Sequence, residues 1–270
     1  MKVISIVNLK GGVGKTATTC NLAYLLSQKG FKTLVIDLDG QANGSRQLGV
    51  PMTYTGKTVK DLYIGQNGIK LPLAEVLFDS PYENLKLAPS SFDFVGAEIL
   101  LKNEPQLSVE YRILNSLESV NDEFDFVLID CPPALGDFVL NAMVASDLII
   151  VPVIADDGSL EGLSRAYMMR MQIEKILRIQ LSFKALFTMW DHTNNSKECR
   201  AELLEILPQE ELFKATIRRG TAVPSSKSAP VCHLKPSSNP ALDYKALVEE
   251  VLTHVQVQSP GHDQAAAGRE

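Results

Sequence analysis

The sequence predicts a three-layer α/β/α fold built on a doubly wound, mostly parallel sheet. Short, nearly continuous apolar runs recur along the chain, at residues 2–7, 33–37, 126–130, 148–153 and 181–189. Segments with a helical spacing of apolar residues separate these runs. Strands that are apolar throughout are typical of parallel sheets covered on both faces, and right-handed crossovers place the covering helices.

The predicted helices and loops complete this picture. A helix over residues 18–29 would end at Gly30, with an inner face of Leu22, Ala23, Leu25 and Leu26. A final helix over 239–255 would bury Leu242, Leu247, Val251 and Leu252. Gly and Pro in residues 50–80 predict an irregular insertion, with weak helical pieces at 59–64 and 73–78. The stretch 218–240 is rich in Ser and Pro and predicts a surface loop.

Composition excludes several classes of protein. With 270 residues, 45% hydrophobic and 21% charged, the chain can bury a core without disulfides or a structural metal. It has no run of about 18 apolar residues and no signal-peptide pattern, so we expect a cytoplasmic protein. Its four cysteines form no CxxC pair, and its four histidines have no metal-ligand spacing. We expect one domain over residues 1–256 and a disordered tail over 257–270.

Charge is unevenly distributed along the chain. The net charge is −6, and acidic side chains are in excess in residues 1–159 and again in residues 246–270. Residues 160–245 carry more basic than acidic side chains. This basic third could bind a polyanion on one face, although the charge pattern alone favours an ordinary solvated surface.

The segment KGGVGKT at residues 10–16 predicts a phosphate-binding loop. It follows a predicted strand and opens a predicted helix, which is the context that such a loop requires. Its glycines let successive backbone N–H groups point at a phosphate, and the helix N-terminus adds partial positive charge. Lys15 would reach the β- and γ-phosphates and the Thr16 hydroxyl would bind Mg²⁺.

A second lysine distinguishes this loop from the usual pattern. The standard motif has glycine at the place of Leu9, and here Lys10 follows. A lysine at the start of the loop is the mark of the deviant Walker-A group. Such a lysine can reach across a dimer interface and neutralise the nucleotide of the other subunit.

Several motifs in this order resemble the ParA partition ATPases of the ParA/MinD superfamily. They are KGGVGKT at 10–16, DLDGQAN at 37–43 and FVLIDCPPALG at 126–136, and the likeness extends to APSSFDFVGAEILL at 88–101, ADDGSLEGL at 155–163 and TMWD at 188–191. The resemblance spans residues 1–256 and implies a P-loop NTPase fold. It also implies an ATP hydrolase that is slow without a partner, with ATP and Mg²⁺ as cofactors.

The resemblance assigns roles to individual residues. Asp130 ends a predicted strand beside the loop and would hold Mg²⁺ together with Thr16 and Asp37, while Asp39 would activate the attacking water. Gly40 stands where the family usually has proline. The catalytic candidates are Lys10, Lys15 and Asp39. The ATP-binding candidates are Lys10, Gly11, Gly12, Val13, Gly14, Lys15, Thr16 and Ala17, of which Ala17 replaces a threonine common in the family.

In the family the ATP-bound homodimer binds DNA without sequence preference, and a ParB-like or adaptor protein stimulates hydrolysis. The corresponding DNA-binding candidates are Arg218, Arg219, Lys197, Arg200 and Lys227. Arg218 and Gly220 replace a proline and an asparagine that contact adenine in relatives. The resemblance therefore implies a cytoplasmic, nucleoid-associated switch for plasmid or chromosome partition or for cargo positioning.

Two other functions remain open from the sequence. A MinD-like switch on a membrane surface would end in a basic amphipathic helix, whereas the last predicted helix carries Glu249 and Glu250. We therefore expect no membrane partner. A metabolic enzyme of the same superfamily, such as a relative of the nitrogenase iron protein or of cobyrinate synthase, is the third possibility. A nitrogenase-iron-protein relative would need bridging cysteines, and Cys131 has no matching second cysteine.

Overall fold

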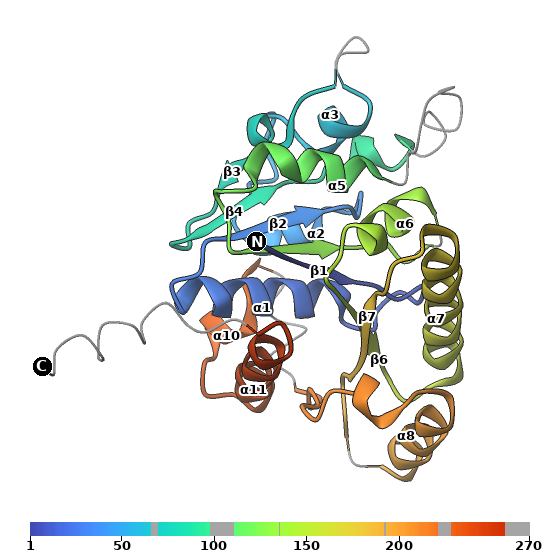
Figure 1. Cartoon of the computed structure of the whole chain (residues 1–270). Coiled ribbons are helices and arrows are strands. Elements are labelled where there is room, and N and C mark those ends of the chain that lie inside the picture. Colours follow the sequence, from blue (N-terminus) through green and yellow to red (C-terminus); the bar gives the residue numbers. More distant parts are fainter. Residues whose placement is uncertain (66–69, 98–110, 135, 192, 221–227, 257–270) are drawn as a thin grey trace, which may run out of the picture.

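A computed structural model gives the fold of the chain (Figure 1). It describes residues 1–65, 70–97, 111–134, 136–191, 193–220 and 228–256, and the structural statements below concern these residues. The predicted tail at 257–270 lies outside them. Among the described helices, none combines the length and the apolar composition that crossing a bilayer requires.

A seven-stranded sheet forms the middle layer, in the order β3-β4-β2-β5-β1-β6-β7. Neighbouring strands are parallel except for the antiparallel pair β3 and β4 at one edge. The strands are β1 (Lys2–Ile6), β2 (Thr33–Asp37), β3 (Phe78–Asp79), β4 (Leu85–Ala88), β5 (Phe126–Asp130), β6 (Leu148–Val153) and β7 (Ser182–Phe187). The carboxyl ends of β1, β2, β5 and β6 therefore meet at one edge of the sheet, where ligands bind in folds of this type.

Helices cover both faces of this sheet (Figure 1). One face packs against α1 (Lys15–Gln28), α10 (Val231–Leu234) and α11 (Asn239–His254), and the other against α5 (Arg112–Leu117), α6 (Asp137–Val144) and α7 (Asp157–Leu177). Successive residues of a strand point to opposite faces: Val127 and Ile129 enter one core and Phe126 and Leu128 the other. This explains why the strands are apolar throughout and confirms the predicted three-layer fold.

Further elements lie in the described part of the chain. They are α2 (Asn43–Gln47), α3 (Val59–Tyr63), α8 (Asn194–Ile206) and the 3₁₀ turns Leu73–Glu75, Phe92–Phe94, Glu118–Val120 and Gln209–Glu211. Helix α8 contributes Cys199 and Leu203 to the same core as α7. Its N-terminal end is fixed by Thr193, whose side chain accepts a hydrogen bond from the Ser196 N–H.

The structure corrects several local predictions. Strands β3 and β4 were not predicted, because they have two and four residues and too little alternation to identify a strand. Phe78 begins β3 and does not extend a helical piece at 73–78. The predicted loop at 218–240 contains α10, whose Val231 and Cys232 are buried. Leu242 is 46% exposed and not in the core, because Ala241 and Tyr244 fill the inner face of α11 beside it.

Candidate active site

The loop between β1 and α1 has the backbone geometry of a phosphate-binding loop. Gly12 and Gly14 adopt φ angles of +78° and +90°, in the left-handed region that residues with a Cβ rarely enter. No atom lies within 4 Å of a Cβ built at Gly11 or Gly12, so the space beside these residues is open. Helix α1 begins at Lys15 directly after the loop, which directs its free N–H groups toward that space.

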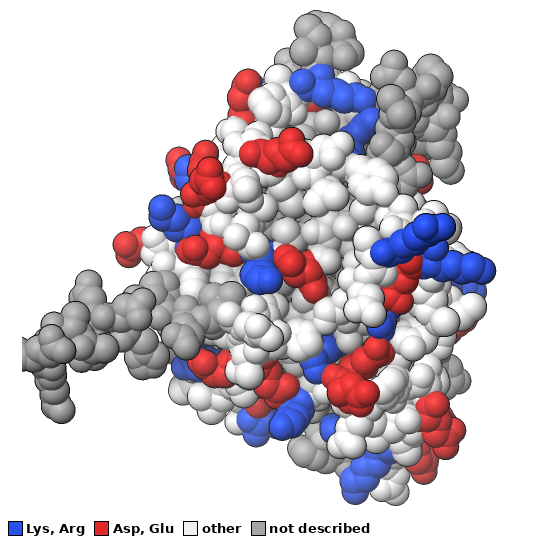
Figure 2. Space-filling model, in the orientation of Figure 1, with Lys and Arg blue, Asp and Glu red and all other residues white. Residues whose placement is uncertain are grey.

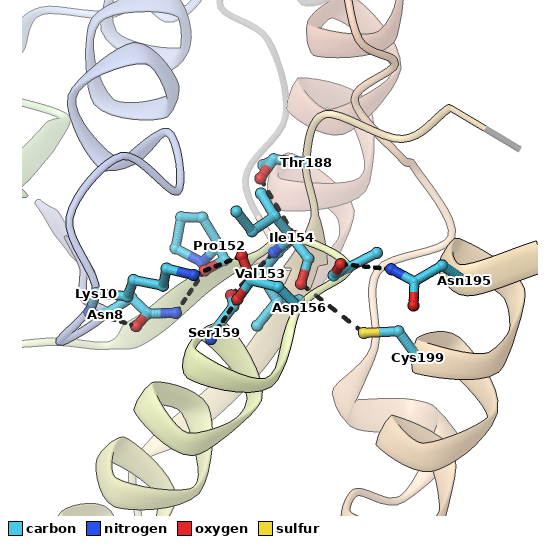
Figure 3. Close-up of polar contacts among 11 residues, drawn as sticks. Asn8, Lys10, Pro152, Val153, Ile154, Asp156, Ser159, Thr188, Asn195 and Cys199 are labelled. Carbon is cyan, nitrogen blue, oxygen red and sulfur yellow. Dashed lines mark hydrogen bonds and ion pairs between the residues drawn. The ribbon is translucent and has the colours of Figure 1, made fainter. Parts of the chain in front are cut away.

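Contacts from distant strands hold the loop in place (Figure 3). The Asn8 side chain donates to the carbonyl of Pro152 at 2.7 Å and accepts from the Lys10 N–H at 2.9 Å. The Thr188 hydroxyl lies 2.8 Å from the Val13 carbonyl oxygen and 3.2 Å from that of Val153. Sequence reasoning did not assign a role to Asn8 or Thr188. Only the order of β1, β6 and β7 in the sheet brings them together.

Lys15 lies at the base of the loop. Its ammonium group donates to the carbonyl oxygen of Lys10 at 2.9 Å, and the side chain is buried. Burial lowers its pKa, while the nearby carboxylate of Asp130 acts in the opposite direction. The structure therefore places one buried cation beside a buried acidic group.

Two buried carboxyl groups lie side by side next to Lys15. Asp37 and Asp130 end β2 and β5 and face each other in the parallel register. Asp37 accepts hydrogen bonds from the N–H and the hydroxyl of Ser45, both at 2.7 Å. Asp130 accepts from the Thr19 hydroxyl at 3.2 Å through Oδ1. Its other oxygen, Oδ2, is buried and has no hydrogen-bond partner.

Burial raises the pKa of both carboxyl groups, to about 6 for Asp37 and about 8 for Asp130. For Asp130 the charge of Asp37 raises the pKa further, and the nearby Thr16 hydroxyl and Lys15 lower it. An unpartnered carboxylate oxygen beside a second carboxylate is costly, and a bound cation would relieve that cost. The described residues contain no preassembled group of three or more metal-ligating His, Cys, Asp or Glu.

Asp39 lies in the loop that follows β2. Its N–H donates to Asp37 Oδ1 at 3.1 Å, and its own carboxylate accepts from the Gln41 N–H at 2.9 Å. At Gly40, a Cβ would meet Val95 Cγ2 at 2.6 Å. The glycine in place of the family's proline therefore permits close packing against the segment that follows β4.

The described DNA-binding candidates differ in how much free charge they present at the surface. Arg218 pairs with Asp243, with Nη2 to Oδ1 at 2.7 Å, so much of its charge is neutralised. Arg219 and Lys197 are exposed, and the Arg200 guanidinium carbon lies 5.7 Å from the centre of the Phe187 ring. In Figure 2, basic side chains alternate with acidic ones over the region of α8 and α11. Lys227 lies outside the described residues.

Replacing Asp130 by asparagine is expected to stabilise the nucleotide-free protein in EDTA at pH 8. The folded pKa of Asp130 exceeds its unfolded value of about 4, so the folded state binds more protons and the wild type loses stability as pH rises through this range. Asparagine cannot ionise. The free energy of unfolding of the variant should therefore exceed that of the wild type by on the order of 1–3 kcal/mol at pH 8, and it should depend less on pH.

Thermal or urea unfolding at pH 5 and pH 8 measures this difference. The exposed Asp122→Asn provides the matched control and should follow the wild type. Addition of Mg²⁺ and nucleotide should then stabilise the wild type more than Asp130→Asn. Equal pH profiles for the wild type and Asp130→Asn would contradict the prediction.

Comparisons with known proteins place this site in a family. A family model described as an AAA domain matches residues 1–183. The sporulation initiation inhibitor protein Soj of Bacillus subtilis is 32% identical over 256 residues, covering 94% of this chain and 99% of Soj. The chain belongs to the ParA/MinD family of P-loop ATPases. The chromosome partitioning protein ParA of Myxococcus xanthus is 29% identical over 262 residues, 96% of this chain and 90% of that protein.

Solved structures share the fold of this chain. Cobyrinic acid a,c-diamide synthase from Mycobacterium smegmatis, with bound ATP analog and magnesium, has a TM-score of 0.80 and 25% identity, and covers 95% of this chain and 96% of its own. Apo McdA from Cyanothece has a TM-score of 0.81 with 24% identity, over 93% of this chain and 99% of that one. These scores confirm the predicted fold for the chain.

Proposed function

We propose that the chain is an ATP hydrolase that acts as a partition-type switch. ATP would drive formation of a homodimer, the dimer would bind DNA without sequence preference, and a ParB-like or adaptor protein would stimulate hydrolysis and release. The cargo would be a plasmid, a chromosome or a protein assembly. In this proposal the protein is cytoplasmic and associates with the nucleoid in its ATP-bound state.

The observation that carries the proposal is the joint geometry of the loop and the carboxylate pair. Backbone N–H groups of residues 11–17 and the Lys15 ammonium would hold the phosphates, and Thr16, Asp37 and Asp130 would hold Mg²⁺. When bound, the ion neutralises charge on the phosphates. Asp39 would orient and deprotonate the attacking water, and Lys10 would reach the nucleotide of the partner subunit.

The relatives support partition over the metabolic alternative. Soj and the Myxococcus ParA align with nearly all of this chain, at 32% and 29% identity. The synthase from Mycobacterium is 25% identical, and its bound ATP analog and magnesium agree with the cofactors that we propose here. The higher identity to these two partition proteins, over nearly the whole chain, is what favours partition over the metabolic alternative.

The packing of α11 disfavours the membrane-surface alternative. Tyr244, Leu247 and Val251 of this helix are buried, and Glu249 pairs at 2.6 Å with Lys29, the C-cap of α1. The apolar face of the last described helix is therefore used within the protein. A membrane-binding amphipathic helix needs such a face free.

DNA binding across a salt series tests the proposal. The full chain is titrated onto non-specific duplex DNA with ATP and with ADP, each with Mg²⁺. We expect binding with ATP only, weakening with salt at a log–log slope of about −0.9 for each phosphate that the protein neutralises. Dimer formation with ATP but no DNA binding in either nucleotide state would reject the partition-type switch.

Arg219→Glu is expected to weaken DNA binding of the ATP state by at least about tenfold and to reduce the salt slope. Arg219 is exposed, whereas the charge of Arg218 is already neutralised by Asp243. Arg218→Gln should therefore have a smaller effect on DNA affinity than Arg219→Glu. ATP-dependent dimer formation serves as the control and should be unchanged in both. If Arg218→Gln lost more DNA affinity than Arg219→Glu, the assignment of Arg219 as the main DNA contact of this pair would be wrong.

A further inference from the structure

The loop lysine Lys10 is engaged within its own protomer. Its ammonium nitrogen lies 2.5 Å from Asp156 Oδ2, and the two side chains are 33% and 37% exposed. Figure 3 shows Lys10 extended from the loop toward the turn between β6 and α7, which carries Asp156. This ion pair joins the start of the phosphate-binding loop to the start of the longest helix described.

The Asp156 carboxylate is held in a fixed position by its own turn. Asp156 is the N-cap of α7, and its Oδ1 accepts a hydrogen bond from the Ser159 N–H at 2.8 Å. The Ser159 hydroxyl accepts in turn from the Ile154 N–H at 2.9 Å. One carboxylate oxygen therefore caps the helix, which leaves the other to face Lys10.

Helix α8 forms hydrogen bonds to the same turn from its other side (Figure 3). The Asn195 side chain donates to the carbonyl of Ala155 at 2.8 Å, and the Cys199 thiol lies 3.8 Å from the carbonyl oxygen of Ile154. The turn that carries Asp156 is thus fixed by hydrogen bonds from both α7 and α8. Lys10 meets a preorganised acceptor and not a mobile surface carboxylate.

Two glycines of α7 let the loop approach this helix closely. A Cβ at Gly158 would lie 3.3 Å from the Lys10 ammonium nitrogen and 3.5 Å from its Cδ. A Cβ at Gly162 would lie 2.2 Å from Asn8 Oδ1, a distance that no real contact permits. Gly158 and Gly162 are one helical turn apart and share a face. That face is shaped to receive Asn8 and the stem of Lys10.

We propose that Asp156 is a positioning residue that retains Lys10 within its own protomer until the ATP-bound dimer forms. The part that concerns the dimer rests on the proposed function, in which Lys10 reaches the nucleotide of the partner subunit. The ammonium group must then leave Asp156 for a phosphate oxygen, once in each protomer. Asp156 therefore opposes dimer formation and raises the nucleotide or protein concentration at which the switch turns on.

Two variants remove the ion pair and keep the helix cap. Asparagine and serine are both favoured N-caps, so Asp156→Asn and Asp156→Ser can still accept from the Ser159 N–H. Asparagine keeps the size of the side chain and loses its charge, and serine is too short to reach Lys10. Glu249→Gln is the matched control, because it removes the Lys29–Glu249 ion pair of similar length at 2.6 Å, far from the loop in sequence.

The first measurement is the dissociation constant of the full-chain dimer, obtained by sedimentation with the non-hydrolysable analog AMPPNP and Mg²⁺. A partly exposed ion pair contributes about threefold to an equilibrium, so a dimer that breaks two should tighten about tenfold in both Asp156 variants. Glu249→Gln should match the wild type. Unchanged or weaker dimers in both Asp156 variants would overturn the proposal.

A second measurement uses the nucleotide-free protein and does not depend on dimer formation. The rate of acetylation of each lysine is followed by site-resolved mass spectrometry. Asp156→Asn and Asp156→Ser should raise the rate at Lys10 by about threefold, and Glu249→Gln should raise it at Lys29 only. Wild-type protein that stays monomeric with AMPPNP would reject the proposed function, while this assay would still decide whether Asp156 retains Lys10. An unchanged acetylation rate at Lys10 in both Asp156 variants would show that Asp156 does not retain Lys10.

Discussion

Replacing Asp39 by alanine is expected to slow ATP hydrolysis by about 10²–10⁴-fold, which is the usual contribution of a general base. ATP binding and dimer formation should persist. Asp39 follows the buried Asp37 in the loop after β2, and its N–H hydrogen bond to Asp37 Oδ1 at 3.1 Å fixes its backbone beside the carboxylate pair. It is less buried than Asp37, as a group that must contact water requires.

Phosphate release under saturating ATP measures the effect on the catalytic rate, and nucleotide binding by titration calorimetry measures affinity separately. A variant that loses rate at unchanged affinity has lost an interaction made in the transition state. Asp93→Ala, at an exposed carboxylate beyond β4, is the control and should hydrolyse ATP normally. Parallel loss of affinity and rate in Asp39→Ala would show that Asp39 holds the nucleotide or its ion.

Replacing Lys15 by methionine should have the second large effect. It should lower both the rate of ATP hydrolysis and the affinity for nucleotide. The change keeps the length of the side chain and removes the one ammonium group buried at the base of the loop. Loss of a preorganised charge at the phosphates costs about 10²–10³-fold in rate, and nucleotide affinity should fall as well. The buried carboxyl groups also lose a neighbouring positive charge, so the pKa of Asp130 should rise further.

The same two assays separate Lys15→Met from Asp39→Ala. Circular dichroism at pH 6 and pH 8 checks that Lys15→Met folds. Lys29→Met is the control, at a partly exposed lysine directly after α1. If Lys15→Met bound AMPPNP as tightly as the wild type, the assignment of the loop as the phosphate site would fail.

The fold could be predicted from the sequence because its main elements are locally encoded. The continuous apolar runs identified β1, β2, β5, β6 and β7, and the structure confirms each of them within two residues. Strands β3 and β4 were missed because strands of two and four residues are too short to carry such a run. Leu242 was misplaced because a helical pattern does not say which of two adjacent apolar residues faces the core.

The candidate site was likewise predictable from the sequence only in part. The glycines and Lys15 of the loop follow from spacing alone, because only residues close in sequence make that turn. The pairing of Asp37 with Asp130 depends on β2 and β5 being neighbours in the sheet. The contact between Arg218 and Asp243 likewise could not be read from the basic character of the C-terminal third.

The sequence by itself determined the family, the fold class and the position of the phosphate-binding loop, because these depend on residues adjacent along the chain. Only the tertiary structure decided which distant side chains contact the loop. Thr188 reaches the Val13 carbonyl across 175 positions, and Asp156 meets Lys10 because β1 and β6 are neighbours. A parallel sheet brings strand ends together regardless of their separation in sequence, so no local pattern indicates which side chains will meet there.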